Sequence, residues 1–302
     1  MFHRCPATAA LAAWLVATPA AEQPPTFHAE TRLVVLQATV KNSQGALVTS
    51  LDRGAFTVYE NGRRQTISLV RRDDVPVSLG LVIDNSGSMR SLRANVEAAA
   101  LAFVRASNPM DDVFVLNFAD KPRIDVPFTD DVHALEAGIA RVDSIGGTAM
   151  RDAVLMAESH LREHASHDRK VLLVITDGND NASTASMSQL RKVVEHSEIA
   201  IFAIGLFRDG DRPTATARDD LDHLTEVTGG VAYYPRSIDR IDAIVLDTAR
   251  QIRRQYTLAY TSSNRALDGS YRSIRVKVTG PGGLSVRNRP GYWATPVTST
   301  IP

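Results

Sequence analysis

Five side chains that carry carboxylate or hydroxyl oxygens stand at spacings that suit the binding of a divalent cation. Asp84, Ser86 and Ser88 lie in one pentad, DNSGS, directly after an apolar run. Thr148 follows two glycines, and Asp177 follows a second apolar run. Carboxylates and hydroxyls are hard oxygen ligands, which suit Mg²⁺, Mn²⁺ or Ca²⁺ better than they suit a soft metal.

Each of these segments also has an ordinary structural interpretation. Asp, Ser and Gly fill many loops, Thr148 could cap a helix, and Asp177 could form a turn. All three segments, however, are expected at the carboxyl edge of one parallel sheet, where open α/β sheets bind ligands. That coincidence favours a shared metal site.

The elements that would position these side chains alternate between strand and helix over residues 77–254. Such alternation predicts parallel strands joined by crossover helices, that is, an α/β fold with a doubly wound, mostly parallel sheet. The predicted strands are residues 77–84, 112–118, 170–176, 199–207 and 231–234, with an antiparallel edge at 124–128. The predicted helices contain residues 92–103, 150–164, 189–194, 221–227 and 238–252.

Two β-rich segments flank this core. The first, residues 30–71, includes predicted strands at 32–41, 56–59 and 65–70, and its Asn61-Gly62 pair predicts a hairpin turn. The second, residues 255–294, includes predicted strands at 256–261 and 273–278. Each segment alone is too short for a stable sandwich, so we expect them to pair with each other in one flanking β module.

The first residues resemble a targeting segment. A short positive start is followed by an apolar run and small residues, which predicts a signal peptide over residues 1–21 and a linker over 22–29. The apolar run is too short to span a membrane, so no integral span is expected after signal removal. We therefore expect an exported protein in the periplasm, on the cell surface or in the medium, with residues 295–302 as a tail.

Composition excludes several classes of function. The 302 residues contain 34 Lys and Arg and 34 Asp and Glu, so no basic excess favours nucleic acid as a partner. Cys5 is the only cysteine and would leave with the signal peptide, which excludes thiol chemistry in the mature chain.

The five positions together resemble the metal-ion-dependent adhesion site of von Willebrand factor type A (VWA) domains. Asp84-x-Ser86-x-Ser88, then Thr148, then Asp177 match all five motif positions. The flanking sequences FTVYENG (56–62) and NRPGYW (288–293) resemble a bacterial, acidobacterial-type branch of VWA-related proteins. The resemblance implies that Ser86, Ser88 and Thr148 supply hydroxyl ligands, that Asp84 and Asp177 bind the ion directly or through water, and that a partner carboxylate completes the coordination.

Other residues could suggest enzymatic chemistry. His160, His164 and His167 are spaced along one helical face, but a solvated face explains them better than a Zn²⁺ site. A Ser-His-Asp triad would need a histidine near Ser86 or Ser88, and His133 is the only remotely placed one. The sequence has neither a G-x-S-x-G nor an H-E-x-x-H motif, so we do not expect an enzyme.

The sequence therefore predicts an exported module that binds a protein partner through a divalent cation. Mg²⁺ is the first choice, and the partner would offer an Asp or Glu carboxylate. Three alternatives stay open: a scaffold of an envelope complex with a structural metal, a metal-dependent hydrolase, and a switch in which metal and partner move the helix at 238–252. The oligomeric state is open as well.

Overall fold

The computed structural model describes residues 33–72, 74–141, 145–178, 180–207 and 215–295. These residues belong to one compact unit, residues 31–302. The predicted signal peptide (1–21), the linker (22–29) and residues 296–302 of the predicted tail lie outside the described residues.

A six-stranded sheet forms the centre of the α/β part. Its strands are β5 (Ser78–Asp84), β6 (Asp112–Phe118), β7 (Pro122–Thr129), β8 (Lys170–Thr176), β9 (Ala200–Gly205) and β10 (Ala232–Tyr233). Their order across the sheet is β10-β9-β8-β5-β6-β7, and every pair is parallel except β6 with the edge strand β7. The predicted fold class, a doubly wound and mostly parallel sheet, is confirmed.

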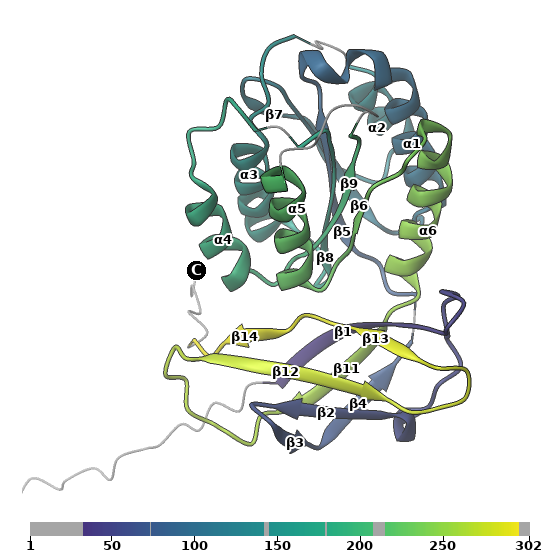
Figure 1. The fold of residues 1–302 in the computed structure, drawn as a ribbon, viewed down its shortest axis with the longest axis vertical. Coiled ribbons are helices and arrows are strands. Elements are labelled where there is room, and N and C mark those ends of the chain that lie inside the picture. The colour runs from purple at the N-terminus through teal and green to yellow at the C-terminus, as the bar shows by residue number, and fades with distance from the viewer. Residues whose placement is uncertain (1–32, 73, 142–144, 179, 208–214, 296–302) are drawn as a thin grey trace, which may run out of the picture. The chain divides into compact units, whose positions relative to one another are not determined.

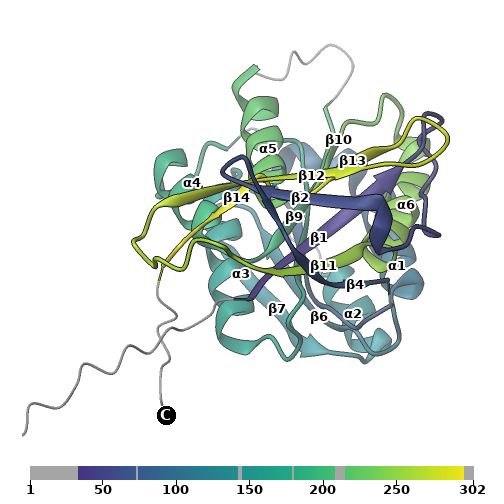
Figure 2. The ribbon, with the colours of Figure 1, turned by 90° about the horizontal axis from the view of Figure 1, so that it is seen from below.

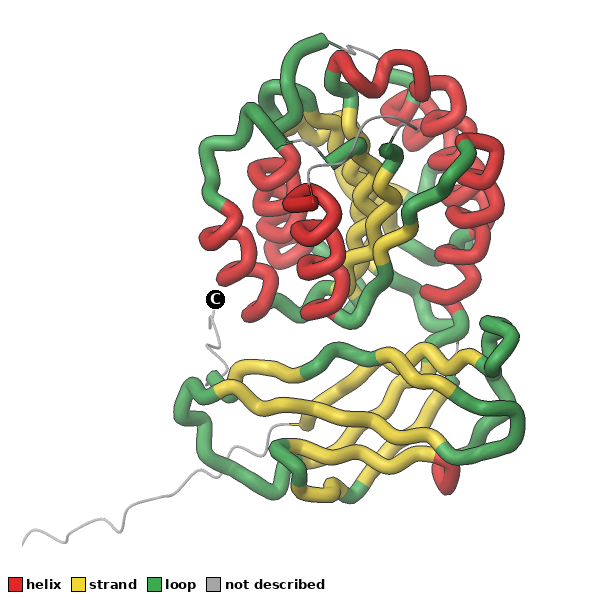
Figure 3. The backbone as a smooth tube through the Cα atoms, in the orientation of Figure 1, coloured by secondary structure: helices red, strands yellow, loops and turns green. Residues whose placement is uncertain are grey.

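Helices cover both faces of this sheet (Figures 1 and 3). They are α1 (Arg93–Ala106), α2 (Val132–Ile139), α3 (Met150–His164), α4 (Met187–His196), α5 (Ala215–Thr228) and α6 (Ile241–Arg253). The 3₁₀ turn η2 (Gly87–Leu92) precedes α1, and η3 (Ile238–Arg240) precedes α6. Helices α1, α2 and α6 contribute to one apolar cluster against the sheet, and α3, α4 and α5 contribute to the other.

Strand β5 lies in the middle of the sheet because it can be covered on both faces. All seven of its residues are buried. Leu79, Leu81 and Ile83 face the α1–α6 cluster, and Val82 faces the α3–α5 cluster. Gly80 lets the ring of Phe114 approach, since a Cβ there would lie 2.4 Å from that ring. This packing fixes the end of β5, where Asp84 stands.

Eight other strands of the described residues form two antiparallel sheets (Figure 2). These two sheets enclose a third apolar cluster. One has the order β13-β1-β11-β4, with β1 (Leu33–Lys41), β4 (Ile67–Arg71), β11 (Tyr256–Thr261) and β13 (Ser285–Arg287). The other has the order β14-β12-β2-β3, with β2 (Phe56–Glu60), β3 (Arg63–Gln65), β12 (Tyr271–Val278) and β14 (Gly291–Trp293). A 3₁₀ turn, η1 (Arg53–Ala55), precedes β2.

The β segments before and after the six-stranded sheet pair with each other, as predicted. Strand β1 pairs with β11 over six residues, and β2 pairs with β12 over five. Both sheets of this β module are therefore built from the two ends of the described chain. The chain leaves the module after β4, forms the α/β part, and returns through the short segment between α6 and β11 (Figure 1).

The predicted hairpin at Asn61-Gly62 is confirmed, but the single strand predicted after it is wrong. Asn61 and Gly62 both adopt positive φ, at 46° and 78°, and connect β2 to β3. The predicted strand is interrupted at Thr66. As a result, β3 pairs with β2, whereas β4 joins the other sheet beside β11. A run of β-forming residues indicates strand propensity but carries no signal for which sheet accepts each half.

Candidate functional site

Asp84 ends the central strand and is almost completely buried. The Ser86 N–H donates to its Oδ1 at 2.8 Å, and the Thr176 hydroxyl donates to its Oδ2 at 2.6 Å. Thr176 is the last residue of β8, which is the parallel neighbour of β5. The carboxyl ends of two adjacent strands therefore meet at this carboxylate.

The electrostatic environment of Asp84 disfavours its charged form. Burial raises the pKa of Asp84 from 3.8 to about 6, the hydrogen bonds from Ser86 and Thr176 oppose that rise, and the nearby carboxylate of Asp177 adds to it. A buried carboxylate beside a second carboxylate is stabilised when a cation lies between them. A divalent cation at this position would therefore reduce the repulsion between the two carboxylates.

Ser86 and Ser88 bring two hydroxyl oxygens together at the start of η2. Their Oγ atoms lie 3.0 Å apart. Ser86 occupies the N-cap position of η2, yet its side chain makes no capping hydrogen bond. The pentad is held in place by Asn85, whose N–H donates to the carbonyl of Phe118 at the end of β6. The Ser86 hydroxyl therefore contacts that of Ser88 and is not used as a helix cap.

Thr148 reaches the same edge on a separate loop. The Gly87 N–H donates to the carbonyl of Gly146 at 3.1 Å, which joins this loop to the pentad. Thr148 is buried and lies just before Ala149, which is the N-cap residue of α3. The expected alternative role of Thr148 as a helix N-cap is therefore not seen.

Asp177 follows β8 directly, at the position predicted from the apolar run. Its Oδ1 atom is shielded from solvent and has no hydrogen-bond partner among the described residues. Its carboxylate is close enough to Asp84 to raise the pKa of that residue. A buried carboxylate oxygen without a partner is costly, and a bound cation would remove that cost.

The structure thus brings Asp84, Ser86 and Ser88 into direct contact, places Asp177 beside Asp84, and joins the Thr148 loop to the pentad through Gly87 and Gly146. The donor set is all oxygen and mixes two acids with three hydroxyls. No group of three or more His, Cys, Asp or Glu residues that could hold a metal occurs in the described part of the chain. A cation here would therefore depend on the hydroxyls, which suits a hard ion such as Mg²⁺.

Comparison with known proteins identifies the α/β part. Residues 79–179, which contain all five positions, match the model of the von Willebrand factor type A domain family. The α/β part has a VWA-like fold. The match does not extend to the β module, and no curated protein matches the chain.

Solved structures support the same fold. A von Willebrand factor type A protein from Catenulispora acidiphila aligns with a TM-score of 0.53 and 10% identity, covering 89% of this chain and 74% of that chain. A D319A mutant of the PilB minor pilin from Streptococcus sanguinis aligns with a TM-score of 0.50 and 12% identity, covering 61% of this chain and 62% of that chain. At these identities the likeness shows the fold alone. Within the described residues, no helix is long and apolar enough to cross a membrane.

Two residues that hold the Thr148 loop in place were missed in the sequence. The Gly147 N–H donates to Asp120 Oδ1 at 2.6 Å, and the Thr148 N–H donates to Asn181 Oδ1 at 2.9 Å. Together they fix the backbone on both sides of the Thr148 hydroxyl. Asp120 follows the end of β6 by two residues, so its place at the carboxyl edge could have been read from the strand pattern.

Asp180 lies three residues after Asp177, and its charge is paired with that of Arg151. Arg151 Nη2 lies 3.0 Å from Asp180 Oδ1, and the Arg151 N–H donates to the other oxygen. Ser183 donates to Asp180 as well, from its hydroxyl and from its N–H. The charge of Asp180 is therefore paired with a cation, and its structural role is to hold the start of α3 against the loop after β8.

The interpretation of the three histidines as a solvated face is also wrong for one of them. His160 is half-buried, its ring stacks on Phe128 with centroids 5.1 Å apart, and it meets Phe114 edge to face at 4.7 Å. Burial is the main cause that lowers the pKa of His160. His164 stacks on His160, whereas His167 bonds to the carbonyl of Met110. The helix pattern could not show that β7 supplies an aromatic partner.

Proposed function

We propose that this chain is an exported module that binds a protein partner through a divalent cation at this candidate site. Ser86, Ser88 and Thr148 would supply hydroxyl oxygens, and Asp84 and Asp177 would bind the ion directly or through water. Mg²⁺ is the first choice, with Mn²⁺ and Ca²⁺ as alternatives. The partner would complete the coordination with an Asp or Glu carboxylate.

The observation that carries this proposal is the proximity of two acids for which the described residues provide no ion-pair partner. Asp84 is buried with a raised pKa, and Asp177 next to it has an unpartnered buried oxygen. Two carboxylates balance the charge of one divalent ion, and neutral hydroxyls donate weakly. The bound ion would therefore still attract an incoming anion.

The surroundings of the site support recognition of another macromolecule. Ser88 and Gly146 are exposed, so the site opens to solvent between the pentad and the Thr148 loop. Ile145, directly before Gly146, is 72% exposed, which is unusual for a large apolar side chain. A partner that binds the ion through a carboxylate would place an apolar group against Ile145.

The ion itself can be tested by calorimetric titration with Mg²⁺, Mn²⁺ and Ca²⁺. We expect saturable binding by the wild-type protein and none by Asp84→Ala or Ser86→Ala. Ser270→Ala, an exposed serine in the β module, is the matched control and should bind normally. Equal binding by wild type and Ser86→Ala would overturn the proposed site.

Partner capture separates this function from its alternatives. An acidic peptide or protein ligand should bind only with the ion present, and Ile145→Ser should weaken its binding without changing the affinity for Mg²⁺. A scaffold with a structural metal predicts instead that ion removal lowers the melting temperature but leaves partner binding intact. Catalytic turnover lost on Ser86→Ala would favour a hydrolase. His133, the histidine considered for that role, has a 95% exposed side chain that lies 3.8 Å from Glu136.

Export is a part of this proposal that needs its own test. Residues 1–21 lie outside the described residues, so the support for a signal peptide comes from their sequence alone. N-terminal sequencing of the protein recovered outside the cytoplasm should show cleavage near Ala20 or Ala21. An intact Met1 in the cytoplasm would contradict export.

A further inference from the structure

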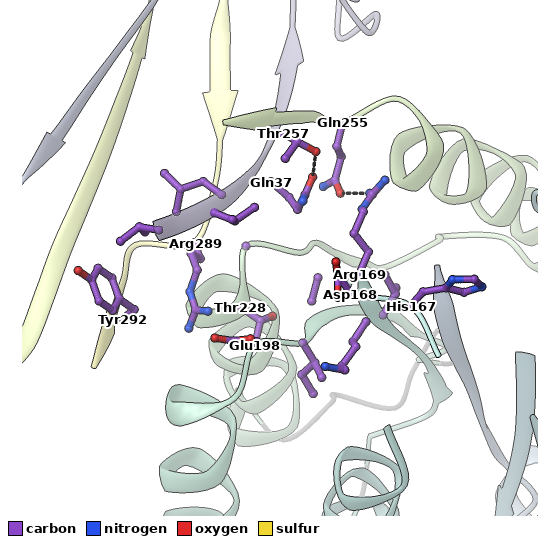
Figure 4. A pocket seen from close by; sticks show the side chains of 18 of the residues that line it. Gln37, His167, Asp168, Arg169, Glu198, Thr228, Gln255, Thr257, Arg289 and Tyr292 are labelled. Atoms are coloured by element: carbon purple, nitrogen blue, oxygen red, sulfur yellow. Dashed lines mark hydrogen bonds between the residues drawn. The ribbon is translucent and has the colours of Figure 1, made fainter. Parts of the chain in front are cut away.

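A cavity of about 630 Å³ lies between the outer face of the β1-β11-β4 sheet and the amino-terminal ends of β8 and β9 (Figure 4). Arg169 and Lys170 line it where β8 begins, whereas Asp177 follows the opposite end of β8. Seven strand residues separate those ends by roughly 20 Å. The cavity is therefore a second site, remote from the proposed metal site, and its volume is typical of small-molecule pockets.

One wall of the cavity is an exposed apolar patch. Leu33, Val35 and Leu69 are 53%, 51% and 40% exposed, and all three line the cavity. Val35 pairs with Ala259, which pairs with Leu69, so these side chains form one row across three strands. Large aliphatic side chains gathered on the face of a sheet are not stabilised by exposure to water, and such patches mark binding surfaces.

Polarity increases along the same wall. Two residues further along the strands, the next row consists of Gln37, Thr257 and Arg71, and the Thr257 hydroxyl donates to Gln37 at 3.1 Å (Figure 4). The wall from Leu33 to Gln37 is about 13 Å long, given the rise of a strand. One end of the wall is therefore apolar and the other end is polar. The distance between the two ends is close to the length of a medium-length acyl chain.

The charged residues of the cavity favour an anion. Its lining contains four cations, Arg71, Arg169, Lys170 and Arg289, and two acids, Asp168 and Glu198. The side chain of Arg169 is buried, and its Nη2 donates to Gln255 Oε1 at 2.8 Å and to the carbonyl of Ile252 at 2.6 Å. These bonds hold one cation of the lining in place, and the surplus of two positive charges would attract a carboxylate.

We propose that this cavity binds an aliphatic carboxylate with a medium-length chain, such as a fatty acid. The chain lies on Leu33, Val35 and Leu69, and the carboxylate lies toward Arg71 and Lys170. A peptide fits less well, because the face of a sheet offers side chains and no free backbone groups. The buried amides of a peptide would lack hydrogen-bond partners there, whereas an acyl chain has none to satisfy.

The test is calorimetric titration of the purified protein with dodecanoate below its micelle-forming concentration. We expect saturable binding of one equivalent, weaker binding of hexanoate, and weaker binding of dodecyltrimethylammonium, which has the same chain with a positive head. EDTA should leave the binding unchanged, because the proposed metal site is at the other end of β8. That independence separates a failure here from a failure of the proposed function.

Variants assign the binding to this cavity. Val35→Thr/Leu69→Thr keeps the β propensity of both strands and should weaken dodecanoate binding about tenfold or more, because apolar contact is lost. Arg71→Gln should weaken the binding of dodecanoate but not of dodecyltrimethylammonium. Val132→Thr removes an exposed valine from α2, away from the cavity, and should bind as the wild type does.

Several outcomes would overturn the proposal. One is the absence of saturable dodecanoate binding by the wild type. Another is equal binding of the anionic and cationic chains, which would indicate nonspecific detergent adsorption. A leucine- and valine-rich tetrapeptide that binds more tightly than dodecanoate would assign the cavity to a peptide. A dimer in sedimentation that dissociates in Val35→Thr/Leu69→Thr would assign the patch to a second copy of the chain.

Discussion

The hydroxyl of Thr176 donates a 2.6 Å hydrogen bond to the buried carboxylate of Asp84, across the boundary between β8 and β5. The same Thr176 oxygen accepts the N–H of Gly178 at 3.0 Å. One side chain therefore connects a carboxylate of the proposed metal site to the turn that carries Asp177. Neither residue of this bond is exposed, so water cannot replace it.

Thr176→Val should weaken Mg²⁺ binding about 10- to 100-fold, as the loss of a residue that orients a metal ligand commonly does. Valine keeps the shape of threonine but cannot donate to Asp84 or accept from Gly178. Thr176→Ser is the matched control, because it keeps the hydroxyl and should retain most of the affinity. Titration calorimetry of the three proteins gives the comparison, and equal affinities would show that the bond does not orient the site.

Metal binding should also depend on pH in a defined window. Since burial raises the pKa of Asp84 to about 6, protons and the cation compete for this carboxylate below that pH. The apparent affinity for Mg²⁺ should level off above about pH 7 and fall by up to tenfold per pH unit below 6. A pH-independent affinity between pH 5 and 7.5 would show that Asp84 does not hold the ion.

The same shift predicts how the metal-free protein responds to pH. The folded-state pKa of Asp84, about 6, lies above its ordinary value of 3.8, so the folded state binds more protons between these values. This residue therefore stabilises the metal-free fold most below pH 4, and its contribution is lost as the pH rises through 6. Thermal melts in EDTA should show this part of the dependence for the wild type, and Asp84→Asn should lack it.

The five positions of the proposed metal site illustrate what the sequence alone could predict. Each stands after an apolar run or before a helical one, so its place at the carboxyl edge followed from strand and helix periods. Asn181 and Thr176 could not be assigned roles in that way, because their contacts cross between elements. The sequence predicts only that Thr176 ends a strand. The pairing of β8 with β5 is needed to show that its hydroxyl contacts Asp84.

In the β module, too, the sequence pattern predicted strands but not the contacts between their side chains. Alternation in β12 predicted a strand at 273–278, and its inward positions Ile274 and Val276 are buried as expected. Arg272 continues that inward face, and its side chain is only 1% exposed. A charged residue at that position predicts solvent exposure, because the sequence does not show that Glu60, on the neighbouring strand β2, lies 4.0 Å from Arg272. The cavity was missed for a related reason, since it forms where separate segments meet.

Gly146→Ala should disturb the Thr148 loop specifically. Gly146 has φ +99°, and an added Cβ would lie 2.2 Å from Asp120 Oδ2. The loop would have to move away from Asp120, and the Thr148 hydroxyl would move with it. We expect Mg²⁺ affinity to fall by about tenfold or more, because the Thr148 hydroxyl would no longer be correctly placed to bind the ion.

Gly45→Ala provides the control for backbone strain alone. Gly45 also has positive φ, at +79°, but an added Cβ would meet nothing within 4 Å. Both variants should lose about 1–2 kcal/mol of unfolding free energy from the left-handed backbone. Only Gly146→Ala should also lose metal affinity. If both variants bind Mg²⁺ as the wild type does, the position of Thr148 is not critical.

The buried pair of Arg272 and Glu60 should determine the stability of the β module. Arg272 Nη1 lies 4.0 Å from Glu60 Oε1, and the two side chains are 1% and 2% exposed. The hydroxyls of Tyr260, Ser262 and Tyr292 all donate to Glu60. Burial, together with the charge of Glu60, raises the pKa of Tyr260, so this hydroxyl stays protonated and remains a donor.

Arg272→Met should therefore lower the free energy of unfolding by about 3 kcal/mol, because it leaves a buried carboxylate without its cation. Adding Glu60→Gln should recover part of that loss, since a neutral amide needs no countercharge. Urea denaturation of the two single variants and the double variant measures the coupling. Because β2 and β12 belong to the β module and contribute no residue to the proposed metal site, Mg²⁺ affinity should stay unchanged in all three. A double variant less stable than Arg272→Met would show that the unpaired charge of Glu60 is not the cause of the loss.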